Sequence, residues 1–287
     1  MAESLKIRNV SRLEMDILID WAAAEGWNPG LFDAGCFYAA DPWGFFVAEL
    51  AGAPVGCISA VVYGTEFGFI GFYIVRPEYR GQGFGMKLWQ TAMKYLTPRI
   101  IGLDGVVSQQ NNYKQSGFQL AYRNIRYVAK NLQQTRLVSS DLPPVSLVPL
   151  GEIPFAQLAE YDKSVFTYGR DAFLQEWIRQ PQASAMGICR GSRLTGYGVV
   201  RACREGFKIG PLFADEPAGA ETLFAALTVG RQGGPVFLDA PEVNPHALML
   251  AINHGMVPVF ETARMYTGGP PDIPLEKVYG VTSFELG

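Results

Sequence analysis

Runs of apolar residues at two different spacings divide the chain into segments of strand length and helix length. The clearest run, residues 69–75, is apolar, β-branched and aromatic, which is typical of a buried strand. Pro77 ends this run, and apolar residues then recur at helical spacing from Leu88 to Leu96, with polar residues between them. The pattern predicts a strand, a short connection and a helix that begins near Gly83.

The same two spacings predict the other elements of the first half. A helix is expected over residues 11–24, with Ser11 as its N-cap and Glu14 three residues later. We further expect strands at residues 5–10, 46–50, 55–62, 67–75 and 100–103, a helix at 109–115 that ends at Gly117, and a strand at 118–129. In this arrangement the strand at 118–129 closes the first sheet.

Residues 26–46 fit neither spacing. This segment is too rich in glycine, proline and aromatic residues for one regular helix, and too apolar for a solvated linker. Two interpretations remain open: a surface loop tucked into the core, or a lid over an acceptor pocket. In the second interpretation its aromatic and acidic side chains contact a small amine with an apolar body. The residues assigned to this contact are Trp27, Asp33, Phe37 and Tyr38.

Composition narrows the class of protein. With 287 residues, 48% hydrophobic and 18% charged, the chain is long enough for two globular domains. A net charge of −3 without a basic run excludes a nucleic-acid-binding surface, so we expect small-molecule partners and a monomer or homodimer. Four cysteines without a C-x-x-C pair and no long apolar run predict a cytoplasmic protein without membrane contact. The chain has only two histidines, which makes a histidine-based metal site or a Ser-His-Asp triad improbable, so no metal is expected.

Three glycines separate the predicted strand from the predicted helix, in the sequence RGQGFG at residues 80–85. Glycines let the backbone approach a ligand closely, and the first turn of a helix offers unpaired amides to an anion such as pyrophosphate. Three alternatives stay open on this pattern. The first is a Walker loop, although the Lys-Ser/Thr pair of that motif is missing here. The second is a dinucleotide fingerprint with Asp104 downstream, although the last glycine comes one position early. The third is a plain glycine-rich turn.

The stretch VRPEYRGQGFG, residues 75–85, resembles the acyl-CoA-binding signature R/Q-x-x-G-x-G/A of the GCN5-related N-acetyltransferases (GNAT). This resemblance implies an α+β fold, with each domain a mostly antiparallel mixed sheet flanked by helices. It also implies that loop amides bind the pyrophosphate of acetyl-CoA, and that the preceding strand splays from its neighbour to meet the pantetheine and the acetyl carbonyl. The residues so assigned to acetyl-CoA are Tyr73, Ile74, Val75, Arg80, Gly81, Gln82, Gly83, Phe84 and Gly85.

Tyr113 belongs to a second motif of this family. The sequence YKQSGF, residues 113–118, resembles the end of a GNAT helix whose tyrosine presents its hydroxyl group to the CoA sulfur. A phenol with a pKa of about 10 can hydrogen-bond to, or protonate, the thiolate that leaves when an amine attacks a thioester. The alternative for a single helical tyrosine is packing, but its spacing to Gly117 and the upstream glycine loop favour the catalytic role.

The second half of the chain repeats the first. Equivalent residues 135–140 positions apart are the pairs Gly56 and Gly196, Gly71 and Gly210, Asp104 and Asp239, and Arg126 and Arg264. Where the first copy has its glycine loop, the second has the acidic stretch DEPAGAE, residues 215–221, and the position of Tyr113 is taken by Ala251. Acidic residues repel a pyrophosphate, so the second copy is expected to be degenerate.

Residues 139–144, SSDLPP, form a polar, proline-bearing stretch that we predict to be a linker. It separates an N-terminal domain, residues 1–138, with the acetyl-CoA site, from a C-terminal domain, residues 145–287. The whole chain resembles tandem-domain, YitH-like bacterial acetyltransferases. We expect the C-terminal domain to contribute to the acceptor site.

These features predict an acetyl-CoA-dependent N-acetyltransferase that acts on a small amine by direct transfer, with Tyr113 as general acid. The general base is not evident, because Gly71 stands where many GNAT relatives carry a glutamate. Glu66, near the start of the strand, is the first candidate base, and the further candidates are Asp33, Tyr38, Asp41, Tyr161 and Asp162. The alternative function is a non-catalytic acyl-CoA-binding sensor, against which Tyr113 argues.

Overall fold

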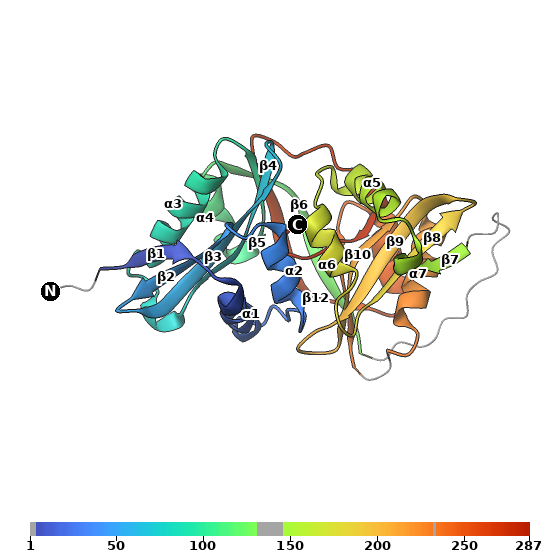
Figure 1. The fold of residues 1–287 in the computed structure, drawn as a ribbon, viewed down its shortest axis with the longest axis horizontal. Helices are drawn as coiled ribbons and strands as arrows, with labels where there is room; N and C mark the ends of the chain where they lie inside the picture. The colour runs from blue at the N-terminus through green and yellow to red at the C-terminus, as the bar shows by residue number, and fades with distance from the viewer. Residues whose placement is uncertain (1–3, 131–145, 232–233) are drawn as a thin grey trace.

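One continuous mixed sheet runs through the molecule, with helices on both of its faces (Figure 1). The computed structural model describes residues 4–130, 146–231 and 234–287. The first half of the chain occupies one end of the sheet and the second half occupies the other. The expected α+β class, with two halves of mixed sheet flanked by helices, is confirmed.

The strands of the first half are β1 (Lys6–Asn9), β2 (Phe45–Leu50), β3 (Ala53–Tyr63), β4 (Phe67–Val75), β5 (Ile100–Val106) and β6 (Phe118–Ala129), and its helices are α1 (Met15–Ala24), α2 (Asp33–Ala40), α3 (Phe84–Leu96) and α4 (Gln110–Gln115). The strands of the second half are β7 (Ser146–Pro149), β8 (Ser184–Arg190), β9 (Arg193–Ala202), β10 (Phe207–Ala214), β11 (Val236–Pro241), β12 (Val257–Thr267) and β13 (Val278–Gly280), and its helices are α5 (Phe155–Phe166), α6 (Asp171–Trp177), α7 (Pro217–Thr228) and α8 (Pro245–Asn253).

Local sequence signals fix the ends of several elements. β4 ends before Pro77, and α3 begins directly after Gly83, whose φ is +80°. The predicted capping box forms, because the amide of Ser11 donates to Glu14 at 2.9 Å, but the chain first makes a 3₁₀ turn and the α-helix starts at Met15. Gly117 follows α4 with a φ of +88°, as expected for a left-handed residue after a helix.

Residues 26–46 contain α2, a helix that the sequence pattern did not predict. α2 packs against α6 of the second half, and the ring of Phe37 stacks on Trp177 with centroids 5.9 Å apart. Nε of Arg201 donates to the buried carboxylate of Asp33 at 2.8 Å. These contacts come from residues far along the chain, so no local pattern reveals them. The segment joins the two halves of the molecule.

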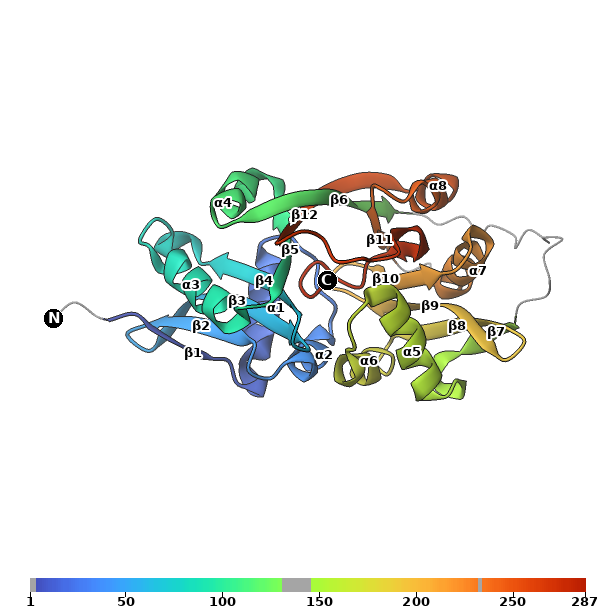
Figure 2. The same ribbon diagram turned by 90° about the horizontal axis from the view of Figure 1, so that it is seen from above.

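The two halves exchange their last long strands. The strand order is β1-β2-β3-β4-β5-β12-β6-β11-β10-β9-β8-β7, with β13 paired to β10. β12 of the second half lies between β5 and β6, and β6 pairs on its other edge with β11; Figure 2 shows β6 and β12 side by side across both halves. The prediction that residues 118–129 close the first sheet is therefore wrong, because β12 takes that place. The linker predicted at residues 139–144 lies outside the described residues, and the domain boundary stays a prediction.

Two buried ion pairs accompany the exchange and join one half to the other. Arg264 on β12 donates to Asp104 on β5 at 3.0 Å, and Arg126 on β6 donates twice to Asp239 on β11, at 2.7 and 2.8 Å. Burial has the largest single effect and would lower the pKa of Arg126, but the charge and hydrogen bonds of Asp239, with smaller effects of Glu285 and Cys203, together raise this pKa. The repeated arginines and aspartates noticed in the sequence are thus the partners of these pairs, each formed between the two copies.

Three hydrophobic clusters arrange the helices. α3 and α4 pack on one face of the first half, and α7 and α8 pack on the second half. α1 and α2 share a single core with α5 and α6 on the opposite face. The common core, the exchanged strands and the two ion pairs hold the halves together as one unit.

Candidate active site

Strands β4 and β5 separate part-way along their length. Their parallel pairing covers Phe67–Ile70 and Ile100–Leu103. The next residues of β4 form a bulge, in which Phe72 has a φ of +45° and the register against β3 shifts between Cys57 and Ser59. A bulge bends a strand away from its neighbour. The splayed strand that the GNAT resemblance implies is therefore present, between residues 71–75 and 104–106.

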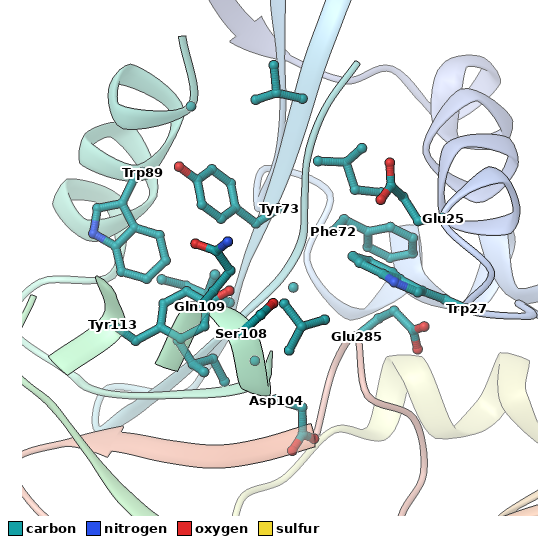
Figure 3. A pocket seen from close by; sticks show the side chains of 18 of the residues that line it. Glu25, Trp27, Phe72, Tyr73, Trp89, Asp104, Ser108, Gln109, Tyr113 and Glu285 are labelled. Carbon is teal, nitrogen blue, oxygen red and sulfur yellow. The ribbon is translucent and has the colours of Figure 1, made fainter. Parts of the chain in front are cut away.

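A cavity of about 830 Å³ lies in the opening between these strands. Figure 3 shows Tyr73, Trp89, Gln109 and Tyr113 on one side of it and Glu25, Trp27, Phe72 and Glu285 on the other. Its walls are largely apolar with a few polar groups, which is the usual composition of a small-molecule site. Both halves of the chain contribute to these walls.

The glycine loop forms the rim of the cavity beside the N-terminus of α3. Gly81 and Gly83 have φ of +78° and +80°, and a Cβ atom added to either would meet nothing within 4 Å. The space beside this helix terminus is thus open to an anion. Arg80 crosses the rim, where its Nε donates to the Val75 carbonyl at 2.8 Å and its guanidinium pairs with Glu25.

Most residues assigned to acetyl-CoA from the sequence line this cavity. They are Tyr73, Ile74, Val75, Arg80, Gly81, Gly83 and Gly85. Gln82 and Phe84 lie outside the lining, since the Gln82 amide donates to the Glu78 carbonyl at 3.3 Å and the ring of Phe84 lies beside Tyr79.

Tyr113 reaches the cavity from α4. Its ring stacks on Trp89, with centroids 5.6 Å apart, and packs against Gly105, where an added Cβ would lie 2.2 Å from the ring. Burial, with a smaller effect of Tyr73, raises the pKa of Tyr113 to about 12. The hydroxyl is therefore protonated at neutral pH and is able to donate a hydrogen bond into the cavity.

Several other predicted site residues lie away from the cavity. Glu66 is exposed in the turn before β4 and is not part of the lining. Of the residues expected to contact the acceptor, Trp27 lines the cavity, whereas Asp33, Phe37 and Tyr38 do not. Asp33 and Phe37 are instead buried in the contact between the two halves.

The remaining candidates for a general base are engaged in hydrogen bonds elsewhere. Asp41 accepts from the amide of Val62 at 3.1 Å and from the hydroxyl of Tyr95 at 3.0 Å. Asp162 forms a buried ion pair with Arg170, and Tyr161 donates to the carbonyl of Thr195 at 3.1 Å. None of these residues lines the cavity.

Four cavity residues from the second half were missed by the sequence reasoning. β12 contributes Phe260 and Thr262, because the strand exchange places it beside β5. The segment after β13 contributes Phe284 and Glu285. Their contribution depends on the pairing of distant strands, which sequence spacing does not reveal.

Gly71 carried the one sequence signal that could have pointed to this segment. A glycine inside a strand often marks the close approach of another backbone. A Cβ added at Gly71 would lie 2.1 Å from the carbonyl oxygen of Glu285. Gly71 thus allows residues 283–287 to pass across β4 at the base of the cavity.

The corresponding opening in the second half is filled by the chain itself. β10 and β11 pair in parallel over Phe207–Ile209 and Val236–Leu238, and then β13 pairs with β10 where the first half has its cavity. The amide of Val281 donates to the carbonyl of Asp239 at 2.8 Å. A Cβ added at Gly210 would lie 2.6 Å from the carbonyl oxygen of Val281.

The acidic stretch of the second half is held in ion pairs. Asp215 accepts from Arg193 at 3.2 Å and from Lys277 at 3.1 Å, and Glu216 accepts from Arg190 at 3.0 Å. These contacts replace the open, glycine-lined rim of the first half. This geometry supports the expectation that the second copy is degenerate, which stays a prediction.

No helix in residues 4–130, 146–231 and 234–287 is long and apolar enough to cross a membrane. Over the same ranges, no group of three or more His, Cys, Asp and Glu side chains is arranged to hold a metal ion.

Two family models match the chain, one in each half. Residues 10–118 match "Acetyltransferase (GNAT) family", and residues 158–280 match "Acetyltransferase (GNAT) domain". The sequence is also 33% identical over 276 residues to a protein named holothin acyltransferase from Pseudoalteromonas sp. (strain SANK 73390). This alignment covers 96% of the present chain and 92% of the relative. The chain belongs to the GNAT superfamily, as a member with two tandem domains. It is an acyltransferase of the GNAT type, and its cosubstrate class is acyl-CoA.

Solved structures share the whole two-domain architecture. A putative acetyltransferase from Pyrococcus horikoshii superposes with a TM-score of 0.81 at 23% identity, covering 99% of this chain and 96% of that one. A tandem GNAT protein from the clavulanic acid biosynthesis pathway superposes with a TM-score of 0.64 at 14% identity, covering 94% and 100%. At these identities the likeness concerns the fold alone.

Proposed function

We propose that this protein transfers the acetyl group of acetyl-CoA to a small amine by direct attack of the amine on the thioester. One observation carries the proposal: the splay between β4 and β5 forms a cavity that has the glycine loop at its rim and Tyr113 on its wall. Acyl transfer from a CoA thioester requires an anion site for the pyrophosphate, a strand with unpaired backbone groups for the thioester arm, and a phenol for the leaving sulfur.

The residues around the cavity fit acetyl-CoA. Open space at Gly81 and Gly83, next to the N-terminus of α3 and to Arg80, suits the pyrophosphate. Residues 71–75 do not pair with β5, so the backbone groups on this edge of β4 are available to hydrogen-bond the pantetheine and to polarise the acetyl carbonyl. Gly85 lets α3 come close to the strand, since a Cβ there would lie 2.7 Å from the Tyr73 hydroxyl.

Tyr113 assists the departure of the thiolate. A thiol has a pKa of about 8.5, so a phenol whose pKa is raised to about 12 is the weaker acid. Net proton transfer to a free thiolate would then cost about 5 kcal/mol. Tyr113 therefore acts as general acid while the C–S bond is breaking, and it stabilises the leaving sulfur chiefly by donating a hydrogen bond.

The acceptor binds on the side of the cavity that the second half completes. Trp27, Phe260 and Phe284 supply aromatic surface there, and Glu25 and Glu285 supply negative charge. Aromatic rings and carboxylates together suit a small amine with an apolar body. The name of the relative, holothin acyltransferase, supports a small-molecule acceptor and makes holothin the first compound to test.

A thiol-release assay tests the function. Acetyl-CoA is incubated with the protein and a panel of acceptors led by holothin and 2-phenylethylamine, and free CoA thiol is followed over time. We expect acceptor-dependent thiol release and an acetylated product with at least one compound. Tight acetyl-CoA binding without turnover on any acceptor would favour the sensor and contradict the enzyme.

A further inference from the structure

Acetylation of an amine requires a proton acceptor. An alkylamine is an ammonium ion at neutral pH, and its nitrogen has no lone pair until one proton leaves. The overall change is R–NH₃⁺ plus acetyl-CoA giving R–NH–acetyl, CoA thiol and one proton. Tyr113 cannot accept this proton, because it is a neutral phenol at neutral pH. A second titratable group of the cavity must take it.

Three carboxylates line the cavity, and two of them already have partners. Asp104 accepts hydrogen bonds from Arg264, from Asn124 at 2.8 Å and from Thr262 at 3.2 Å. Glu25 pairs with Arg80 at the rim, where its side chain is 31% exposed. Asp104 is thus occupied by three donors, and Glu25 lies at the exposed rim of the cavity beside the glycine loop.

Glu285 is the third carboxylate, and it differs from the other two. Its residue is only 4% exposed, and its Oε1 is buried without any hydrogen-bond partner among the described residues. Burying a carboxylate oxygen without a partner is costly, and a catalytic role is one of the reasons for which proteins keep such a group. Figure 3 places Glu285 across the cavity from Tyr113, on the side where the acceptor is proposed to bind.

The chain holds Glu285 in this position by several backbone contacts. The carbonyl of Leu286 accepts from the hydroxyl of Tyr63 at 2.8 Å, and the amide of Leu286 donates to the Ser283 hydroxyl at 3.1 Å. Gly71 leaves room for the carbonyl of Glu285, which a Cβ would meet at 2.1 Å. The segment from the second half therefore supplies a carboxylate at a point of β4 where the strand itself has no side chain.

The cations that interact with Glu285 from neighbouring elements are Arg126, Arg201 and Lys208. Arg126 and Arg201 are each bound by their own carboxylate, Asp239 and Asp33. Burial, and then the charge of Arg126, lower the pKa of Lys208, which donates to the Trp27 carbonyl at 3.4 Å. Glu285 is thus no partner in either arginine pair, but Nη1 and Nη2 of Arg201 are buried without a hydrogen-bond partner among the described residues. Lys208 and this end of Arg201 are therefore the competing explanations for the charge of Glu285.

We propose that Glu285 is the general base of the acetyl transfer, a role that rests on the proposed function. Its carboxylate accepts one proton from the acceptor ammonium, and the freed lone pair forms the C–N bond with the acetyl carbon. The C–S bond then breaks, and its electron pair stays on the sulfur beside Tyr113. The second proton of the attacking nitrogen ends on the CoA thiolate, and Glu285 returns its proton to solvent.

The substitution Glu285→Gln tests this role, because it keeps the shape of the side chain and removes its basicity. With the fastest alkylamine of the panel, we expect kcat/KM near neutral pH to fall by about 10²-fold, the usual scale for a positioned base. The deficit should shrink as the pH approaches the pKa of the free amine, since solvent then supplies the neutral nucleophile. The Kd of acetyl-CoA, measured by calorimetry, should stay within about twofold, and Glu285→Asp should retain part of the activity.

Two outcomes would overturn the proposal. A Glu285→Gln variant with the wild-type rate and pH profile would show that the base lies elsewhere. Recovery of activity in the double variant Lys208→Gln with Glu285→Gln would show that Glu285 only balances the lysine charge. If instead the wild-type protein acetylates no amine of the panel, both the proposed function and this role fail, which separates that result from a failure of Glu285 alone.

Discussion

Each half of the molecule has an opening between two parallel strands. In the first half this opening is a cavity, and in the second half other segments of the chain fill it. Between β4 and β5 the strands diverge around a cavity of about 830 Å³. Between β10 and β11 the equivalent space is occupied by β13 and Val281. A duplicated fold has thus kept one opening for a ligand and closed the other with its own backbone.

The segment that closes the second opening also completes the first. After β13 it continues to the base of the first cavity, where Phe284 and Glu285 form part of the wall. β12 likewise belongs to the second half of the chain but takes the place beside β5. The second half therefore lacks an open, glycine-lined rim of its own and contributes strand β12 and part of the cavity wall to the first half.

The largest expected effect is the loss of acetyl-CoA binding when a substitution blocks the rim of the cavity in the first half. Gly83→Glu places a side chain and a negative charge at a φ of +80°, beside the N-terminus of α3. We expect acetyl-CoA binding measured by calorimetry to be abolished while the protein stays folded. Gly52→Glu is a matched control, because Gly52 has a φ of +79° and open surroundings in an exposed turn that is not part of the cavity lining. An unchanged Kd in Gly83→Glu would remove this loop from the site.

The next largest effect concerns the exchange of strands. Arg264→Met leaves Asp104 buried without its charge partner, which costs about 3–5 kcal/mol for a buried ion pair. We expect the free energy of unfolding, measured with denaturant, to fall by this amount. Arg123→Met is the control on the neighbouring pair of strands, β6 and β12, since the exposed pair of Arg123 with Glu261 contributes about 0–1 kcal/mol. Equal losses in the two variants would contradict a structural role for the buried pair.

Tyr113 and its counterpart Ala251 mark a chemical difference between the halves. Tyr113→Phe removes the hydroxyl beside the leaving sulfur and keeps the ring stacked on Trp89. We expect kcat to fall by about 10²-fold with little change in the Kd of acetyl-CoA. Tyr73→Phe, which alters the other phenol on this side of the cavity, should cost less. If Tyr113→Phe turns over at the parent rate, or if Tyr73→Phe is the slower variant, the acid has been misassigned.

The smallest expected effect concerns the rim. Glu25 pairs with Arg80, so the pyrophosphate must compete with this carboxylate for the guanidinium. An exposed pair of this kind contributes about 0–1 kcal/mol, which corresponds to at most about fivefold in affinity. Glu25→Gln should therefore tighten acetyl-CoA binding by up to that factor in titration calorimetry. Weaker binding in this variant would indicate that Glu25 positions Arg80 for the cofactor.

The sequence predicted most of the cavity wall that residues close together along the chain provide, although Glu66, Gln82 and Phe84 do not line the cavity. The strand, glycine loop and helix at residues 67–96 follow from apolar spacing, Pro77 and the glycines, and the structure places them as expected. Tyr113 was assigned through the resemblance of YKQSGF to a GNAT motif, which is also local because it spans only residues 113–118. The same reasoning identified the repeated arginines and aspartates without showing that they pair between the copies.

The parts that were missed depend on contacts between distant residues. α2 is stabilised by packing against α6, and β12 takes the place beside β5 that was predicted for β6. Glu285 lines the cavity but belongs to a segment that contains no recognisable motif. Propensity and spacing carry no information on such pairing, because tertiary contacts decide it. Gly71 on β4 and Gly210 on β10 are the strand glycines that indicate the close approach of this distant backbone.

The number of acetyl-CoA molecules bound per chain tests the difference between the two openings most directly. Native mass spectrometry of the wild-type protein with excess acetyl-CoA counts them. The open cavity of the first half and the filled opening of the second predict one molecule per chain, and none in Gly83→Glu. Two equivalent molecules per chain, or one that persists in Gly83→Glu, would contradict the assignment of the site to the first half.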